Sequence, residues 1–168
     1  SALMNVCIKT GELNLALDVY KEMLNEGCTP NLVTFNTLID VYGKTGQWEE
    51  AIAVLDAVEE KGLEPEARTY NTAIIACNQS SRAKEALQVY ERMLKARARP
   101  TATTYTALIA ANGKAGQLDQ ALEIFESMEK HKCEKNVITY SSLISACEKA
   151  GEWQLALKLF NDMHNDGC

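Results

Sequence analysis

The amino-acid sequence predicts an all-α fold, an α-solenoid in which 35-residue helix-turn-helix repeats stack into a right-handed superhelix. The first observation is composition: the 168 residues are rich in the helix formers Ala, Leu, Glu, Lys and Met and contain only three prolines. The second is that the sequence aligns with itself after a shift of 35 residues. The third is that all three prolines, Pro30, Pro65 and Pro100, fall in one column of that alignment.

Each repeat carries the same apolar columns, at steps of three and four residues that are typical of amphipathic helices. A column of small residues, where two helices can approach closely, holds Ala16, Ala51, Ala86, Ala121 and Ala156. An aromatic column, expected to pack in the core, holds Phe35, Tyr70, Tyr105 and Tyr140. Because one short helix pair cannot bury both of its faces, neighbouring pairs must stack to complete the core.

The first element of a repeat is predicted as a helix over residues 34–44 in one copy, and the second as a helix over residues 47–60. The threonine column of Thr34, Thr69, Thr104 and Thr139 is expected to cap the first helices. A glycine column is expected to end the same helices in a left-handed conformation, at Gly11, Gly46, Gly116 and Gly151. The prolines then turn the chain into the next repeat.

The domain organisation is predicted as a single array over residues 1–168. It has complete repeats at 32–66, 67–101 and 102–136, a partial repeat at 1–31 and a C-terminally truncated repeat at 137–168. The truncated repeats predict that this chain is a piece of a longer array, and that the two ends of the piece lack polar capping helices. Exposed apolar surface and self-association through these ends are therefore expected.

The remaining motifs argue against catalysis, metals, cofactors and membranes. No apolar stretch approaches the length of a membrane span, and no targeting segment is expected, because the N-terminus has no basic flank followed by an apolar core. The cysteines recur in two columns, with Cys7, Cys77 and Cys147 in one and Cys28, Cys133 and Cys168 in the other, and are interpreted as reduced, buried thiols. His131 and His164 lie beside no evident partner, so no metal site is expected. Trp48 and Trp153 are interpreted as packing residues.

The phrases at residues 33–46 (VTFNTLIDVYGKTG) and 121–130 (ALEIFESMEK) resemble the pentatricopeptide repeat (PPR) family, and the repeat length fits its P-type motif. This resemblance covers essentially the whole chain. It implies an organellar protein of the chloroplast or mitochondrion, with no enzyme activity of its own. Such a protein binds single-stranded RNA, each repeat reading one base, and supports RNA stabilisation, processing or translation.

The resemblance also implies which residues read the bases. One column lies near the start of the first helix and the other at the end of each repeat. The pairs are Ser1 with Asn31, Asn36 with Glu66, Asn71 with Thr101 and Thr106 with Asn136, while Ser141 stands without a partner. By the family's code the first and last pairs select adenine and the middle two select pyrimidines. The predicted target is 5′-A-Y-Y-A-3′, with the base at Glu66 the least regular.

Two further columns complete the predicted surface. Residues that sandwich the bases are expected at Val33, Arg68, Thr103 and Ile138. Residues that contact phosphates are expected at Lys9, Lys44, Lys114 and Lys149, a column interrupted by Gln79. This column answers the objection that the chain's net charge is −6, because the acidic residues fall mostly on the second helices.

Three alternatives stay open at the level of sequence. The lysines could be a solvated helix end that favours the C-terminal dipole, and the polar columns could be helix caps. The array could also be a protein-interaction scaffold, since helical solenoids often present a concave surface to peptides.

Overall fold

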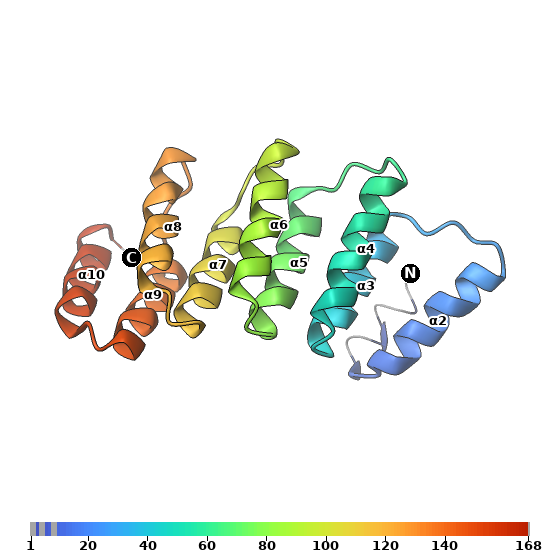
Figure 1. Ribbon diagram of the computed structural model, residues 1–168, viewed down its shortest axis with the longest axis horizontal. Coiled ribbons are helices and arrows are strands. Elements are labelled where there is room, and N and C mark those ends of the chain that lie inside the picture. Colours follow the sequence, from blue (N-terminus) through green and yellow to red (C-terminus); the bar gives the residue numbers. More distant parts are fainter. Residues whose placement is uncertain (1–2, 4–5, 8–9, 168) are drawn as a thin grey trace. The chain divides into compact units, whose positions relative to one another are not determined.

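The computed structural model describes residues 3, 6–7 and 10–167, and every regular element in that part of the chain is a helix (Figure 1). The helices are α2 (Leu13–Asn25), α3 (Leu32–Lys44), α4 (Trp48–Glu60), α5 (Ala67–Gln79), α6 (Ala83–Lys95), α7 (Ala102–Lys114), α8 (Leu118–Lys130), α9 (Val137–Ala150) and α10 (Trp153–Asn165). First helices and second helices each begin at intervals of 35 residues, which confirms the predicted all-α repeat architecture. No helix over the described ranges is long and apolar enough to cross a bilayer.

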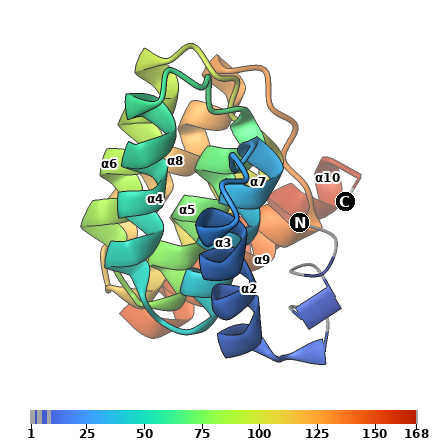
Figure 2. The ribbon, with the colours of Figure 1, turned by 90° about the vertical axis from the view of Figure 1, so that its right-hand side faces the viewer.

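The chain divides into two compact units, residues 1–80 and 81–168. In the first unit α3 packs against α2, α4 and α5, and α4 also packs against α5. In the second unit α7 packs against α6, α8 and α9, while α9 also contacts α8 and α10. Figure 2 shows the resulting layers of the second unit, with α7 and α9 on one side and α6 and α8 on the other. First helices thus form a continuous layer within each unit.

Aromatic and small residues build the core as the columns predict. Phe35 and Leu38 of α3 pack with Val58 of α4, and Tyr20, Val54 and Leu63 surround this cluster. The aromatic column is at most 2% exposed at Phe35, Tyr70, Tyr105 and Tyr140. The small-residue column is fully buried at Ala16, Ala51, Ala86 and Ala121. These positions are therefore packing residues.

Neighbouring first helices approach most closely at two glycines. A Cβ atom placed on Gly43 of α3 would lie 2.8 Å from the Cβ of Ala76 on α5. A Cβ atom on Gly113 of α7 would lie 2.7 Å from the Cβ of Ala146 on α9. Both distances are shorter than carbon atoms tolerate, so the absence of a side chain permits the contact. The layer of first helices depends on these small pairs.

The turn after each first helix has the predicted left-handed residue. Gly46 has φ 76°, and the N–H of Gln47 donates to the carbonyl of Tyr42 at 2.8 Å, which closes the helix end. Ser81 occupies the same column and takes φ 58° without the freedom of glycine. The glycine column is thus confirmed at the described positions that hold glycine, and one repeat builds the same turn with serine.

The predicted start of the first helices is wrong by two residues. In the repeat at 32–66 the helix begins at Leu32 rather than Thr34, and Asn31 is its N-cap. The Asn31 Oδ1 atom accepts hydrogen bonds from the backbone N–H and the hydroxyl of Thr34, each at 3.0 Å. Thr34 is 1% exposed and is the third helical residue, so the threonine column supports the cap from within the helix.

Three predictions about single side chains also fail. Trp153 is 68% exposed and does not pack, because α10 contacts only α9 among the described helices. Cys28 is exposed in the turn between α2 and α3, and Cys133 is half-buried.

Cys7, Cys77 and Cys147 are buried free thiols as predicted, and burial raises the pKa of the Cys147 thiol, which favours its neutral form. Cys168 lies outside the described residues.

Candidate nucleic-acid interface

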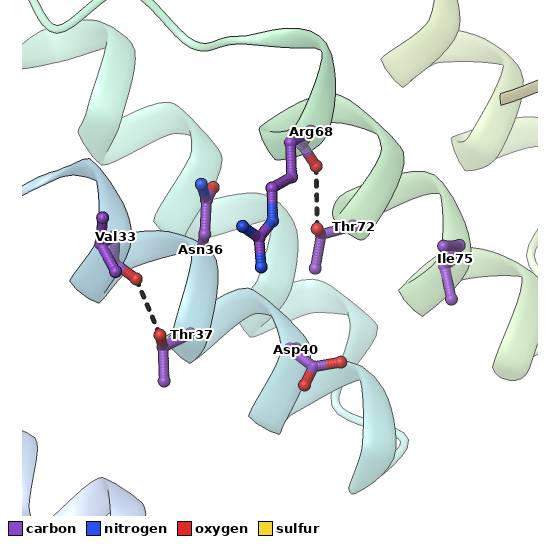
Figure 3. Close-up of a pocket in the computed structure, with 7 residues that line it drawn as sticks. All are labelled: Val33, Asn36, Thr37, Asp40, Arg68, Thr72 and Ile75. Atoms are coloured by element: carbon purple, nitrogen blue, oxygen red, sulfur yellow. Dashed lines mark hydrogen bonds between the residues drawn. The ribbon is translucent and has the colours of Figure 1, made fainter. Parts of the chain in front are cut away.

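A pocket of about 310 Å³ opens between α3 and α5 in the first unit (Figure 3). It is lined by Val33, Asn36, Thr37, Asp40, Arg68, Thr72 and Ile75. Val33 and Arg68 come from the predicted sandwiching column of two consecutive repeats, and Asn36 comes from the predicted reading column. The direct packing of α3 on α5 brings these positions, 35 residues apart in sequence, to one cavity.

Asn36 contributes an unusual group to this pocket. Its Oδ1 atom is buried and has no hydrogen-bond partner among the described residues. A buried acceptor without a donor costs about 1–3 kcal/mol relative to a satisfied one. Such orphaned polar atoms are uncommon in native proteins and indicate either strain or a missing ligand. The reading position therefore holds an acceptor that a ligand N–H could satisfy.

Arg68 extends from the first turn of α5 across the pocket, with its guanidinium between Asn36 and Thr72 (Figure 3). Glu66, the predicted second reader for this base, is not among the lining residues. Glu66 is an exposed N-cap of α5 whose side chain makes no capping hydrogen bond. The pocket thus brings together Asn36 with Val33 and Arg68 of the sandwiching column, but it does not include Glu66.

The predicted phosphate contact of the first unit is partly neutralised. Lys44 Nζ lies 2.9 Å from the Oδ2 atom of Asp40, one helical turn earlier on α3. Both side chains remain about 40% exposed, so solvent weakens the pair without abolishing it. The spacing of four residues predicts this ion pair from sequence alone. Sequence reasoning nevertheless overlooked Asp40, which lowers the positive charge available to a phosphate here.

A second pocket of about 320 Å³ lies between α7 and α9 in the second unit. Ile138 and Ser141, predicted to sandwich and to read, line it together with Lys114 and Lys149. The position equivalent to Asp40 is Ala110 on α7 and Ser145 on α9, so no acidic residue lines this pocket. It therefore combines hydroxyl groups with two ammonium groups, a chemistry suited to a phosphodiester.

The second reading column has a structural task besides the predicted one. Asn31 and Asn136 are N-caps of α3 and α9, and their side-chain oxygens accept the N–H groups of Thr34 and Thr139. At the head of α7 the N–H of Thr101 donates to the Thr104 hydroxyl at 2.9 Å. The cap interpretation thus holds for these side chains. For Asn31 and Asn136 the proposed reading role would fall to the side-chain amide N–H groups, which the caps do not use, and for Thr101 to its hydroxyl.

The other predicted site residues lie on the first helices. Asn71 on α5 and Thr106 on α7 are half-buried, and Thr103 on α7 is exposed. Ser1 and Lys9 lie outside the described residues. Sequence reasoning missed Thr37, Thr72 and Ile75 in the first pocket and Ser142 and Ser145 in the second. Thr37, Thr72 and Ser142 lie four residues after a sandwiching position, and Ile75 and Ser145 lie four residues after a reading position, so the helical period was the available signal.

Beneath this surface, tyrosine hydroxyls tie the first helices to the ends of second helices. Tyr70 Oη donates to Glu59 Oε1 at 3.2 Å, and Tyr140 Oη donates to Asp166 Oδ2 at 2.5 Å. Tyr105 Oη lies 2.8 Å from the Nδ1 atom of His131, a hydrogen bond that the sequence did not predict. Burial, and then the hydrogen bond to Tyr90, raises the pKa of Tyr105 far above its ordinary value. The hydroxyl therefore remains neutral.

Metal ligands do not gather in this interface. Over residues 3, 6–7 and 10–167 no group of three His, Cys, Asp or Glu residues is placed to hold a metal ion. The polar groups of the two pockets are amides, hydroxyls, one guanidinium and ammonium groups, apart from the carboxylate of Asp40. This arrangement can donate and accept hydrogen bonds and attract anions.

A family model described as a pentatricopeptide repeat-containing protein matches residues 1–128, and a PPR repeat model matches residues 138–168. The chain belongs to the pentatricopeptide repeat family. No curated protein sequence matches this PPR chain significantly. The family assignment explains why the two-helix unit and its 35-residue period recur throughout the array.

Solved structures agree with this PPR assignment. PPR10 in complex with an 18-nt psaJ RNA element is 29% identical, with a TM-score of 0.80 over 98% of this chain and 28% of that one. PPR10 from maize is 30% identical, with a TM-score of 0.67 over 99% of this chain and 29% of that one. This PPR chain therefore spans less than a third of PPR10.

A third structure shows that the fold persists when sequence similarity is low. The PPR domain of Arabidopsis thaliana protein-only RNase P 1, in complex with tRNA, has a TM-score of 0.82 over 98% of this chain and 86% of that one. At 14% identity this likeness concerns the helical architecture alone. The α-solenoid class predicted from the PPR sequence is thus supported by structural comparison.

Proposed function

We propose that this chain binds single-stranded RNA along its first helices, one base per repeat, as a non-catalytic module without a cofactor. The observation that carries the proposal is the pocket between α3 and α5, where Val33, Asn36 and Arg68 of two consecutive repeats meet. Small polar groups beside an apolar side chain suit a nucleobase, which offers both hydrogen-bonding edges and a stacking face. The RNA complex of PPR10, at 29% identity, supports the same ligand class.

The predicted pairs define the proposed target as 5′-A-Y-Y-A-3′. Ser1 with Asn31 and Thr106 with Asn136 are assigned to adenine, and Asn36 with Glu66 and Asn71 with Thr101 to pyrimidines. Val33, Arg68, Thr103 and Ile138 are proposed to sandwich the bases, and Lys9, Lys44, Lys114 and Lys149 to contact phosphates. Each base contact contributes about 1–3 kcal/mol of discrimination, so a few repeats alone bind weakly.

The family resemblance supports a proposal for the biological setting. We place the protein in the chloroplast or the mitochondrion, where binding would stabilise an RNA, guide its processing or support its translation. These outcomes share one physical step, which is occupation of an unpaired RNA segment by the groove. A competing role as a protein-interaction scaffold would use the same helices for a peptide.

A titration of the chain with fluorescent RNA tests the proposal. Fluorescence anisotropy would compare an oligonucleotide containing ACUA with one containing the scrambled CAAU, at about 50 and about 200 mM salt. We expect tighter binding to ACUA, and weaker binding to both RNAs at the higher salt. Circular dichroism serves as the folding control. Absence of RNA binding by a folded chain would contradict the proposal and favour the protein scaffold.

A further inference from the structure

The pocket between α3 and α5 differs from its counterpart in the second unit by a guanidinium group. Arg68 occupies a column that otherwise holds Val33, Thr103 and Ile138 among the described residues. No ion pair to Arg68 is present in the described part of the chain, and its side chain points into the cavity. The pocket therefore contains the guanidinium of Arg68, the carboxylate of Asp40 that pairs with Lys44, and a buried acceptor without a donor.

We infer that Arg68 is a specificity-determining residue and that this pocket selects cytosine over uracil. The inference rests on the proposed RNA binding and deepens it from a pyrimidine to one base. The Asn36 Oδ1 atom supplies an acceptor, and the planar guanidinium supplies two parallel N–H donors. Acceptor, donor, donor is the pattern that guanine presents to cytosine in a Watson–Crick pair.

Cytosine satisfies each of these groups. Its N4–H would donate to Asn36 Oδ1, and its N3 and O2 atoms would accept the two N–H groups of Arg68. Uracil carries a hydrogen on N3, which would face an N–H of Arg68, so two donors would oppose each other. Guanine carries a hydrogen on N1, so its Watson–Crick edge would also set a donor against an N–H of Arg68. Adenine can satisfy only one N–H of the guanidinium.

The geometry also says how a base would enter. Because the Asn36 oxygen is covered, a base can reach it only after a side chain moves. Arg68 is the long, exposed side chain on this pocket and can turn aside without disturbing the core. Glu66 does not line the pocket. In this inference Arg68 therefore hydrogen-bonds to the edge of the base, and this role replaces both the sandwiching role of Arg68 and the reading role of Glu66 at this one repeat.

The test measures binding of four RNAs that differ only at the second base of the target, ANUA within constant flanks. Wild-type chain should prefer C over U by roughly 5- to 150-fold, the range of a bidentate base contact. Arg68→Val, which introduces the residue found at position 33, should bring C and U to within about twofold. Arg68→Lys keeps the charge and the salt dependence but lacks the planar fork, so it should also lose the preference for C.

A control variant and two outcomes keep the test decisive. Lys61→Ala removes an exposed positive charge at the end of α4, outside the pocket, and should leave the C to U ratio at the second base unchanged. An Arg68→Val variant that weakens binding to all four RNAs equally would assign Arg68 to stacking or to a phosphate, and would overturn the inference while RNA binding itself stands. A wild-type chain that binds no RNA would instead overturn the proposed function on which the inference rests.

Discussion

At the scale of single residues, Asn136 shows how one side chain can serve both helix and ligand. Its oxygen caps α9 by accepting the N–H of Thr139 at 3.0 Å, while the proposed reading role uses the amide N–H groups. Thr101 stands at the same position at the head of α7. Asparagine and threonine can therefore replace each other as the N-cap of a first helix. They would present different groups to a base, an amide in one case and a hydroxyl in the other.

This exchangeability allows a test of the reading columns. Thr106→Asn combined with Asn136→Thr reproduces the pair found at Asn71 and Thr101. We expect the fourth base of the target to change in preference from adenine towards pyrimidine, with the thermal midpoint of unfolding nearly unchanged. Anisotropy with ACUA and ACUC measures the preference. Asn136→Ala is the structural control, since loss of the cap should cost about 0.5–2 kcal/mol of stability. Unaltered base preference in the double variant would contradict the assignment.

The ion pair between Asp40 and Lys44 leads to a second prediction at this scale. Asp40→Ala introduces the residue of the equivalent position, Ala110, and releases Lys44 from its 2.9 Å partner. Affinity for RNA at low salt should rise, and the slope of log affinity against log salt should steepen by up to about one. The double variant Asp40→Ala, Lys44→Ala should lose this gain. An unchanged slope in the single variant would remove Lys44 from the phosphate contacts.

At the scale of the elements, the 35-residue period predicted the helices because equivalent residues pack in the same way in each repeat. The aromatic and small columns needed no structure for their interpretation, since each lies on the inner face of every copy. Helix starts were harder, because Asn31 and Thr34 are both good capping residues and only backbone geometry decides between them. The bond between Tyr105 and His131 joins residues of different helices, and no local pattern encodes it.

The candidate site was also predictable in part, because its residues recur in columns of the repeat. The columns placed Val33 and Asn36 of one first helix and Arg68 of the next on equivalent faces, and direct packing of α3 on α5 brings these faces to one cavity. Sequence could not show that the Asn36 oxygen is buried without a partner, because this depends on the neighbouring repeat. Exposure of Trp153 likewise depends on which helix stands beside α10.

The close approach of first helices provides a prediction at this scale. Gly113→Ala would add a Cβ atom 2.7 Å from the Cβ of Ala146. Alanine improves helix propensity by up to about 1 kcal/mol, but overpacking costs about 1–3 kcal/mol, so we expect net destabilisation. Urea unfolding measures the effect. Adding Ala146→Gly should restore part of the loss, because it removes the opposing methyl group. A Gly113→Ala chain more stable than wild type would mean that α7 and α9 separate at little cost.

At the scale of the whole molecule, apolar side chains remain uncovered on α10. Trp153, Leu157 and Phe160 are 68%, 55% and 55% exposed and follow one another at steps of four and three residues. Such a stripe on one helical face favours association. We expect sedimentation velocity to show mass increasing with concentration, and Trp153→Glu with Phe160→Glu to suppress the increase. Gln154→Glu, an exposed change on the same helix, is the control and should not. Monomeric wild-type chain at high concentration would contradict this prediction.

The direct contact of neighbouring first helices would also constrain the proposed RNA ligand. Packed helices are separated by about 8–10 Å, whereas stacked bases along a strand are only about 3.4 Å apart. Bases held on consecutive helices, such as α3 and α5, therefore cannot remain stacked on each other. A target sequence inside a hairpin stem must first melt, and its apparent affinity falls by the free energy of opening that stem. The spacing of the helices would thus make the protein respond to RNA secondary structure as well as to base identity.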